Sequence, residues 1–167
     1  MNRRQLLALP MTPLAAALVA ACGQDEGFAD GMLPIKWDRD ACARCGMAIS
    51  DRRFAVQLRG GARNLAFKFD DIGCATTWCS EKVRQQPWIN DPATRWWVAD
   101  FSASGAAAGT RWLSARTAHY ASGPRSPMGY NLAAYAQPQA GSLAFEAMAE
   151  KTAATWPATC RPGAKTT

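Results

Sequence analysis

The stretch that decides the fold is LAFKFDDIGCATTWCSEK, which spans residues 65–82. Phenylalanines alternate with other residues up to Phe69, which predicts a strand. Asp70-Asp71 then supplies a helix N-cap and places acidic charge at the positive end of the helix dipole. The following residues, Ile72 to Lys82, are predicted to be helical. A strand that leads directly into a helix is therefore the local unit.

A second strand precedes this unit, and a third follows it. Phe54 to Leu58 is an alternating run, and Gly60-Gly61 separates it from the strand that starts at Leu65. Two such runs around a glycine pair predict a β-hairpin. Pro87 is expected to stop the helix. Arg95 to Phe101, RWWVADF, is predicted to be a third strand.

The second half of the chain repeats this order. Trp112-Leu113 opens an extended piece, and strands are predicted at Ala118 to Ala121 and Leu132 to Ala136. Ser142 is expected to cap a helix from Leu143 to Lys151. Both predicted helices end in Glu-Lys. The chain therefore predicts an α+β fold of two packed ββα-type units, at about 41–101 and 112–152 within a domain of residues 41–152.

The N-terminus has the pattern of an export signal. Arg3 and Arg4 precede an uncharged run that is too short for a full membrane span, and small residues lead into Cys22. This predicts a lipoprotein signal peptide at residues 1–21, with lipidation at Cys22. The arginine pair leaves twin-arginine and general export both open.

The predicted signal peptide places the folded part of the chain outside the cytoplasm. Residues 22–40 are polar and acidic and are predicted to be a lipid-anchored tether, and residues 153–167 a flexible tail. The expected location is the bacterial cell membrane or outer membrane, lipid-anchored and facing the periplasm.

Composition excludes several classes of protein. The chain has 167 residues, is 49% apolar and 19% charged, and so has globular composition. Beyond the N-terminus it has no apolar run that could cross a bilayer, which excludes a polytopic membrane protein. Phosphate-binding glycine loops are absent. The only histidine, His119, argues against His-rich zinc hydrolases and Ser-His-Asp catalysis. The net charge of +6 is spread without basic runs, so no nucleic-acid partner is expected.

The cysteine motif CARCGM, residues 42–47, is the densest chemical feature. Covalent haem would need histidine after Cys45, where Gly46 stands. A bend at Gly46 can turn the sulfurs of Cys45 and Met47 toward one point. Thiolate and thioether ligands select Cu(I) over hard cations. Cys42 and Cys45 could alternatively form a thiol-disulfide redox pair.

Other residues could complete or replace this site. Met128, in the stiff turn Pro127-Met128-Gly129, and His119 are candidate further ligands. Cys74 and Cys79 could join Cys42 and Cys45 in a structural zinc site. A disulfide, Cys42 to Cys45 or Cys74 to Cys79, and simple burial of the helix cysteines remain open. Without Cys22 the chain has an odd number of cysteines, so at least one thiol is unpaired within the chain.

These features together resemble the nitrous oxide reductase accessory lipoproteins, the NosL family. The ordered motifs, which cover nearly the whole chain from Cys22 to about residue 151, are the lipobox, the run Cys42-x-x-Cys45-Gly46-Met47-x-Ile49, the run Phe67-x-Phe69-Asp70-Asp71-Ile72-Gly73-Cys74, the block Trp112-Leu113-Ser114-Ala115-Arg116-x-Ala118-x-Tyr120, and Pro127-Met128-Gly129.

The resemblance implies a membrane-anchored Cu(I) metallochaperone rather than an enzyme. Its partners would be nitrous oxide reductase, whose copper-sulfide centre it would help to assemble, or a copper-delivery membrane complex. It implies two ββα-like units, akin to part of organomercurial lyase, and a copper site at Cys45, Met47 and Met128. Cys160 has no counterpart in the family. Alternatives are a periplasmic thiol-disulfide oxidoreductase, an organomercurial-lyase-like enzyme and a zinc-stabilised scaffold.

Overall fold

The computed structural model of the chain describes residues 27–155. The predicted signal peptide, the lipidation site Cys22 and Cys160 lie outside these residues. Within them, no helix is long and apolar enough to cross a membrane. The elements are β1 (Val56–Gly60), β2 (Leu65–Phe69), α1 (Ile72–Lys82), the 3-10 helix η1 (Pro87–Asn90), β3 (Arg95–Ala99), the 3-10 helix η2 (Phe101–Ala103), β4 (Trp112–Ser114), β5 (His119–Ser122), β6 (Leu132–Tyr135) and α2 (Phe145–Thr155).

The strands form two antiparallel sheets. The larger sheet has the order β2-β1-β3-β4, and β5 pairs with β6 in a separate hairpin. The predicted α+β class and the two units are confirmed, since β1-β2-α1 and β5-β6-α2 repeat one order and the two helices pack together. One strand differs from the prediction, because β4 pairs with β3 and so belongs to the first sheet.

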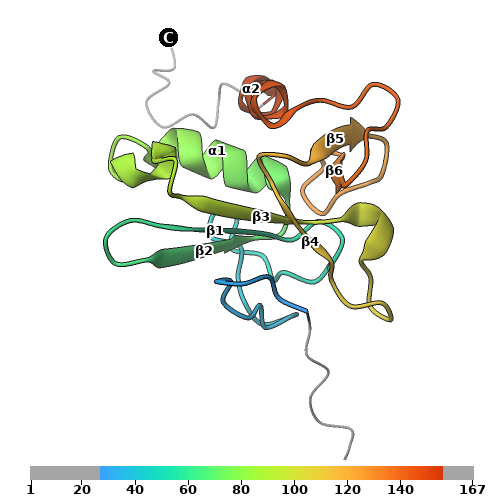
Figure 1. Cartoon of the computed structure of the whole chain (residues 1–167), viewed down its shortest axis with the longest axis horizontal. Helices are drawn as coiled ribbons and strands as arrows, with labels where there is room; N and C mark the ends of the chain where they lie inside the picture. Colours follow the sequence, from blue (N-terminus) through green and yellow to red (C-terminus); the bar gives the residue numbers. More distant parts are fainter. Residues whose placement is uncertain (1–26, 156–167) are drawn as a thin grey trace, which may run out of the picture.

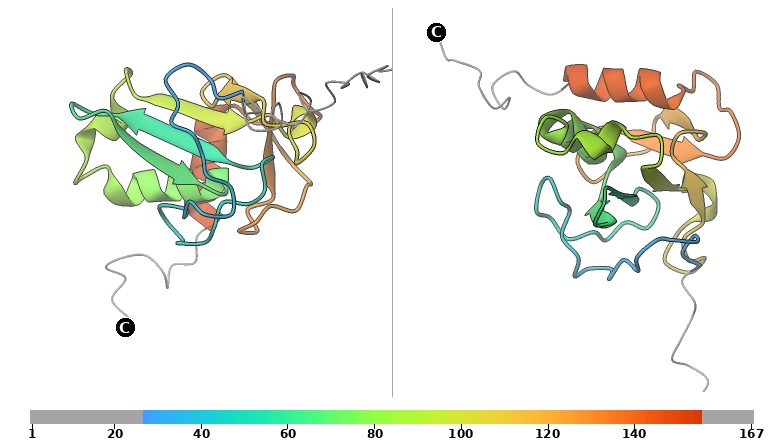
Figure 2. Two further views of the ribbon diagram at one scale, coloured as in Figure 1. Left: turned by 90° about the horizontal axis from the view of Figure 1, so that it is seen from below. Right: turned by 60° about the vertical axis from the view of Figure 1, so that its left-hand side comes forward.

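The larger sheet has a different cover on each face. Helix α1 lies over one face, and α2 packs beside α1 (Figures 1 and 2). Phe67 and Phe69 point toward this side, where Trp78 of α1 lies with ring centroids 4.4 Å and 5.6 Å from theirs. The core therefore forms between the sheet and the helices, and it extends to the β5-β6 hairpin through the fully buried Tyr120.

The opposite face is covered by the N-terminal segment, Gly27 to Ser50 (Figures 1 and 2). Gln57 of β1 is fully buried, and its side-chain amide donates to and accepts from the backbone of Leu33 at 2.7 Å. Ile35 is also buried. The prediction of a tether over residues 22–40 is thus wrong for residues 27–40. The hydrogen bonds of Leu33 to Gln57 and the burial of Ile35 hold this segment against the sheet.

The second helix is displaced from its predicted position. Leu143 exchanges two backbone hydrogen bonds with Tyr120, at 2.9 Å and 2.7 Å, so it is extended rather than helical. Helix α2 starts two residues later, at Phe145, and Ser142 does not cap it. It continues to Thr155, so the tail predicted over residues 153–167 begins within the helix.

Candidate metal centre

Cys42 and Cys45 are presented by a tight turn. The Cys42 amide donates to the Met47 carbonyl at 2.8 Å, and the Gly46 amide donates to the Cys42 carbonyl at 3.0 Å. Gly46 has a φ of 77°, in the left-handed region that glycine adopts without steric cost. The backbone does bend at Gly46. The bend brings the thiols of Cys42 and Cys45 together, whereas Met47, which was expected to turn toward Cys45, is 52% exposed.

The turn is attached to both elements of the first unit. The Ala43 amide donates to the carbonyl of Lys68 in β2 at 2.8 Å. The Arg44 guanidinium forms a 3.0 Å ion pair with Glu81 in the last turn of α1. Only 8% of the Arg44 side chain is exposed, so this pair is shielded from bulk water. The turn is thus held over the junction between β2 and α1.

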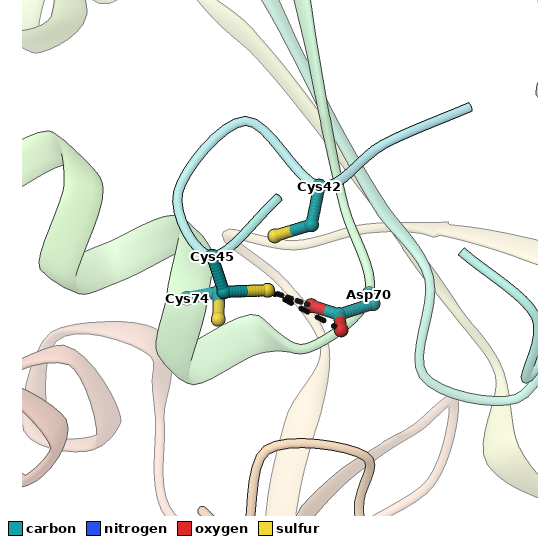
Figure 3. Close-up of side chains that lie close together, drawn as sticks. All are labelled: Cys42, Cys45, Asp70 and Cys74. Carbon is teal, nitrogen blue, oxygen red and sulfur yellow. Dashed lines mark hydrogen bonds between the residues drawn. The ribbon is translucent and has the colours of Figure 1, made fainter. Parts of the chain in front are cut away.

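That junction supplies the other half of the cluster. Asp71 is the N-cap of α1, and its carboxylate accepts from the Gly73 amide at 2.9 Å. Of the predicted Asp70-Asp71 pair, only Asp71 therefore caps the helix. Asp70 directly follows β2 and lies beside the cysteine turn, and Cys74, in the first turn of α1, lies there too (Figure 3).

Three thiols and one carboxyl converge at this point. The ligand atoms of Cys42, Cys45, Cys74 and Asp70 all lie within 4.8 Å of one another. Figure 3 shows the four side chains close together, and the Cys45 thiol donates to the Asp70 oxygens at 3.6 Å and 3.7 Å. All three cysteines are free thiols. The arrangement can hold a metal ion with ligands from two segments far apart in sequence.

The cluster shifts the pKa values of its own members. A hydrogen bond from the Cys74 thiol lowers the pKa of Cys42 to about 4, whereas the pKa of Cys74 itself rises because its proton is held by Cys42. Burial raises the pKa of Cys45 to about 11. Burial, together with the neighbouring Cys42, raises the pKa of Asp70 to about 7. At neutral pH one thiolate, on Cys42, is thus ready to bind a cation.

Access to the cluster is one-sided. Cys42 is 2% exposed and Cys74 is fully buried, whereas Cys45 is partly exposed. Met47 follows two residues later and is 52% exposed. A metal ion would therefore be shielded on the Cys42 and Cys74 side and approachable at Cys45 and Met47.

A comparison with solved structures gives a match over most of the chain. The chain is similar to the copper chaperone NosL from Shewanella denitrificans. The match has 19% sequence identity and a TM-score of 0.45, and it covers 72% of this chain and 86% of that one. No protein-family model and no curated protein match the sequence.

The two predicted methionine ligands lie on different segments, the cysteine turn and the loop between β5 and β6. Met47 extends from the cysteine turn toward solvent. Met128 is half-buried in the loop between β5 and β6, and its amide donates to the Asp71 carboxylate at 3.3 Å. The Ser126 hydroxyl donates to the same carboxylate at 2.6 Å. This loop therefore borders the β2–α1 junction that carries Asp70.

The predicted histidine ligand does not join the cluster. His119 lies in β5, next to the fully buried Tyr120. Successive side chains of a strand point to opposite faces, so His119 points away from the core that Tyr120 enters. His119 is not among the clustered ligand atoms.

The helix cysteines separate into two roles. Cys74 joins Cys42 and Cys45, whereas Cys79 does not. Five residues of α-helix correspond to a rotation of about 140°, so the two thiols point to different sides of α1. The four-thiolate zinc site and the Cys74–Cys79 disulfide are therefore not formed, and the four described cysteines are free.

Asp70 is the member of the cluster that the sequence analysis did not predict. It was assigned to the helix cap together with Asp71. A signal was present, since one N-cap needs only one carboxylate, and the second acidic residue had no assigned partner.

Proposed function

We propose that this chain is a copper carrier that binds Cu(I) at Cys42, Cys45 and Cys74. The observation that carries the proposal is the convergence of three thiols within 4.8 Å of one another. Thiolates are soft ligands that favour Cu(I), and they are poor ligands for Mg²⁺ or Ca²⁺. Asp70 can accept a proton or orient the Cys45 thiol, with which it is in contact.

The unequal exposure of the cluster supports transfer rather than permanent storage. Cu(I) accepts two or three ligands, so an acceptor's ligand can bind before the donor ligands leave. The buried Cys42 and Cys74 would hold the ion, and the exposed edge at Cys45 and Met47 would admit the acceptor. Met47, a neutral thioether, would be the ligand that exchanges most easily.

The acceptor and the location follow from the motif resemblance. We infer that the copper is delivered for the copper-sulfide centre of nitrous oxide reductase, directly or through a membrane complex. A lipid at Cys22 would hold the carrier at a periplasm-facing membrane surface, where confinement raises its effective concentration near such a complex. Cu(I) is cargo here, and the chain's role is binding and hand-over rather than catalysis.

An anaerobic Cu(I) competition titration tests the proposal. The purified chain is compared with Cys42→Ser, Cys45→Ser and Cys74→Ser, and each is expected to weaken one-to-one binding on the order of a hundredfold. The matched control is Cys79→Ser, because Cys79 is also a buried free thiol of α1 but lies outside the cluster. Met47→Leu and Met128→Leu report whether either thioether binds. Equal binding by all variants would overturn the proposal.

A second function is favoured by the same convergence, because two thiols and a carboxyl could also cleave a carbon–mercury bond. Two thiolates would bind the mercury of R–Hg⁺ while the Asp70 carboxyl protonates the carbon, releasing R–H and leaving Hg²⁺ on sulfur. Incubation with phenylmercuric acetate and measurement of benzene separates the two functions. Benzene release that requires Asp70 would establish an enzyme; stable binding without benzene would exclude this second function.

The thiol-disulfide alternative meets a steric objection. The thiolate of such an enzyme must attack an external disulfide, but Cys42, whose pKa is the lowered one, is 2% exposed. The reduction potential of the Cys42–Cys45 pair tests this alternative. An oxidoreductase needs a potential within the range of known dithiol enzymes.

A further inference from the structure

A cavity lies between the two helices, on the side of α1 that carries Cys79. Its volume is about 360 Å³, within the range typical of small-molecule sites. The lining residues come from α1, η1, β3, α2 and the link after β4, and they include Cys79, Ile89, Trp96, Arg116, Phe145 and Ala149. Cys74, five residues before Cys79, belongs to the metal cluster. The cavity is therefore separate from the candidate metal centre.

The walls are mainly apolar. Trp96 of β3 and Phe145 of α2 meet edge to face, with ring centroids 5.3 Å apart. Ile89 of η1 is buried against the same core. Such walls favour an aromatic or aliphatic ligand body, because its transfer out of water is favourable.

One hydrogen-bond donor of the lining, the guanidinium of the exposed Arg116, is available to a ligand. Trp96 is 6% exposed, and its indole N–H has no acceptor in the part of the chain that the structure describes. The indole nitrogen is itself shielded from solvent, so Trp96 contributes its ring to the cavity wall. Arg116 stacks over the Phe145 ring at 5.7 Å and, among residues 27–155, forms no ion pair.

The lining contains no opposing negative charge. None of its residues is aspartate or glutamate. Burial raises the pKa of the Cys79 thiol to about 12, so this thiol is neutral at physiological pH. An anionic group would therefore meet the Arg116 charge without repulsion from the walls.

We propose that this cavity binds a small organic carboxylate with an apolar body, of the size of an arylalkanoate. The carboxylate accepts from the Arg116 guanidinium, and the body packs against Phe145 and Ile89. The site lies between α1 and α2, so its ligand contacts both units of the fold. It is independent of the metal proposal, because no residue is shared between the two sites.

The test compares two probes of equal shape. The carboxylate 3-phenylpropionate is titrated into the purified full chain, and the neutral amide 3-phenylpropanamide is titrated in parallel. Calorimetry gives the affinity, and the indole N–H resonance of Trp96, assigned through Trp96→Phe, reports occupancy of the cavity. We expect a Kd for the carboxylate on the order of a millimolar or below, and binding of the amide about tenfold weaker.

Three variants locate the binding. Arg116→Gln removes the charge and is expected to weaken carboxylate binding about tenfold while leaving amide binding unchanged. Ala149→Phe fills the cavity and should abolish binding of both probes. The control is Arg63→Gln, an exposed arginine outside the lining, which should bind like the wild type. The melting temperature of each variant verifies its fold.

Two outcomes would overturn the proposal. In the first, the carboxylate does not shift the Trp96 indole resonance at millimolar concentration. In the second, the amide binds as well as the carboxylate, or Arg116→Gln binds both probes like the wild type. Arg116 is exposed, so its substitution does not depend on tolerance of a change in the core.

Discussion

The charge of the cluster resides mainly on Cys42. The Cys74 thiol donates to its sulfur and lowers its pKa to about 4, whereas burial raises the pKa of Asp70 to about 7. A thiolate and a carboxylate side by side would repel each other, so the proton that Cys42 loses is in effect retained by Asp70 up to neutral pH. Below neutral pH the cluster therefore carries a single negative charge, on Cys42, while Asp70, Cys45 and Cys74 keep their protons.

This distribution predicts how the stability of the metal-free protein varies with pH. A lowered folded pKa makes Cys42 stabilising above its unfolded value of about 9, and this stabilisation is lost as the pH falls toward 4. The raised pKa of Asp70 has the opposite effect, because its contribution to the free energy of unfolding falls as the pH rises from about 4 to about 7. From pH 7 to 9 the Cys42 contribution dominates, and it is opposed toward pH 9 by Cys45, Cys74 and Cys79, whose raised pKa values keep them protonated in the folded protein. The free energy of unfolding should rise by about 1 kcal/mol over this range.

Urea denaturation of reduced, metal-free protein at pH 7, 8 and 9 checks this expectation. Cys42→Ser should lose the rise, because no thiol of lowered pKa remains. Cys79→Ser should keep it, since the pKa of Cys79 is raised to about 12 and its thiol is protonated in the folded protein throughout. A wild-type stability that is flat or falls between pH 7 and 9 would contradict the assigned thiolate.

Gly73 is required because an aromatic ring occupies the place of its side chain. A Cβ at this position would lie 2.1 Å from the Tyr130 ring, a separation that atoms do not adopt. Gly73→Ala is expected to destabilise the protein by about 2 kcal/mol, because Tyr130 or the first turn of α1 must move. Gly105→Ala is the matched control, since a Cβ at Gly105 meets no atom within 4 Å. Equal denaturation midpoints for the two variants would refute the close packing.

At the scale of elements, the sequence was informative where a signal is local. Helix α1 and strand β2 have their predicted bounds, because the cap at Asp71 and the alternation up to Phe69 are both read from adjacent residues. The start of α2 was misplaced, since Leu143 pairs with Tyr120, 23 positions earlier in the chain. The metal cluster was predicted only in part, again because some of its contacts are not local in sequence. Cys42 and Cys45 are neighbours in sequence, whereas Asp70 and Cys74 reach them only through tertiary packing.

Asp71 connects helix α1 to the loop between β5 and β6. Its carboxylate accepts from Gly73 within the helix and from Ser126 and Met128 in the loop. Asp71→Ala removes a helix cap and leaves buried donors without an acceptor, so it is expected to cost about 2–3 kcal/mol. Asp91→Ala, which removes an exposed carboxylate that accepts from the Ala93 amide, should cost only a few tenths. Chemical denaturation of both variants gives the comparison.

The Asp71 variant also tests the position of the loop relative to the cluster. If the loop borders the bound metal, its release should weaken Cu(I) binding by Asp71→Ala about tenfold, although Asp71 is not in the set of clustered ligand atoms. Unchanged Cu(I) affinity in a folded Asp71→Ala protein would separate the loop, and Met128 with it, from the copper site.

On the scale of the whole molecule, the cluster joins two layers. Cys42 and Cys45 belong to the N-terminal segment under the sheet, and Asp70 and Cys74 belong to the edge where β2 passes into α1 (Figure 3). Without metal, the turn is held by the Ala43–Lys68 hydrogen bond and the Arg44–Glu81 ion pair. A metal bound by both layers adds a connection that exists only in the folded state, so its binding free energy contributes to stability.

Hydrogen exchange can resolve where this stabilisation acts. Loading with Cu(I) should slow exchange most in residues 41–49 and in the first turn of α1, because opening of the turn now requires a metal–sulfur bond to break. Exchange in the β5-β6 hairpin should change little, apart from the loop that contacts Asp71. In Cys45→Ser the protection of residues 41–49 should be lost, whereas Cys79→Ser should retain it. Protection spread evenly over the molecule would instead mean that metal binding stabilises the fold as a whole and that the cysteine turn does not open independently.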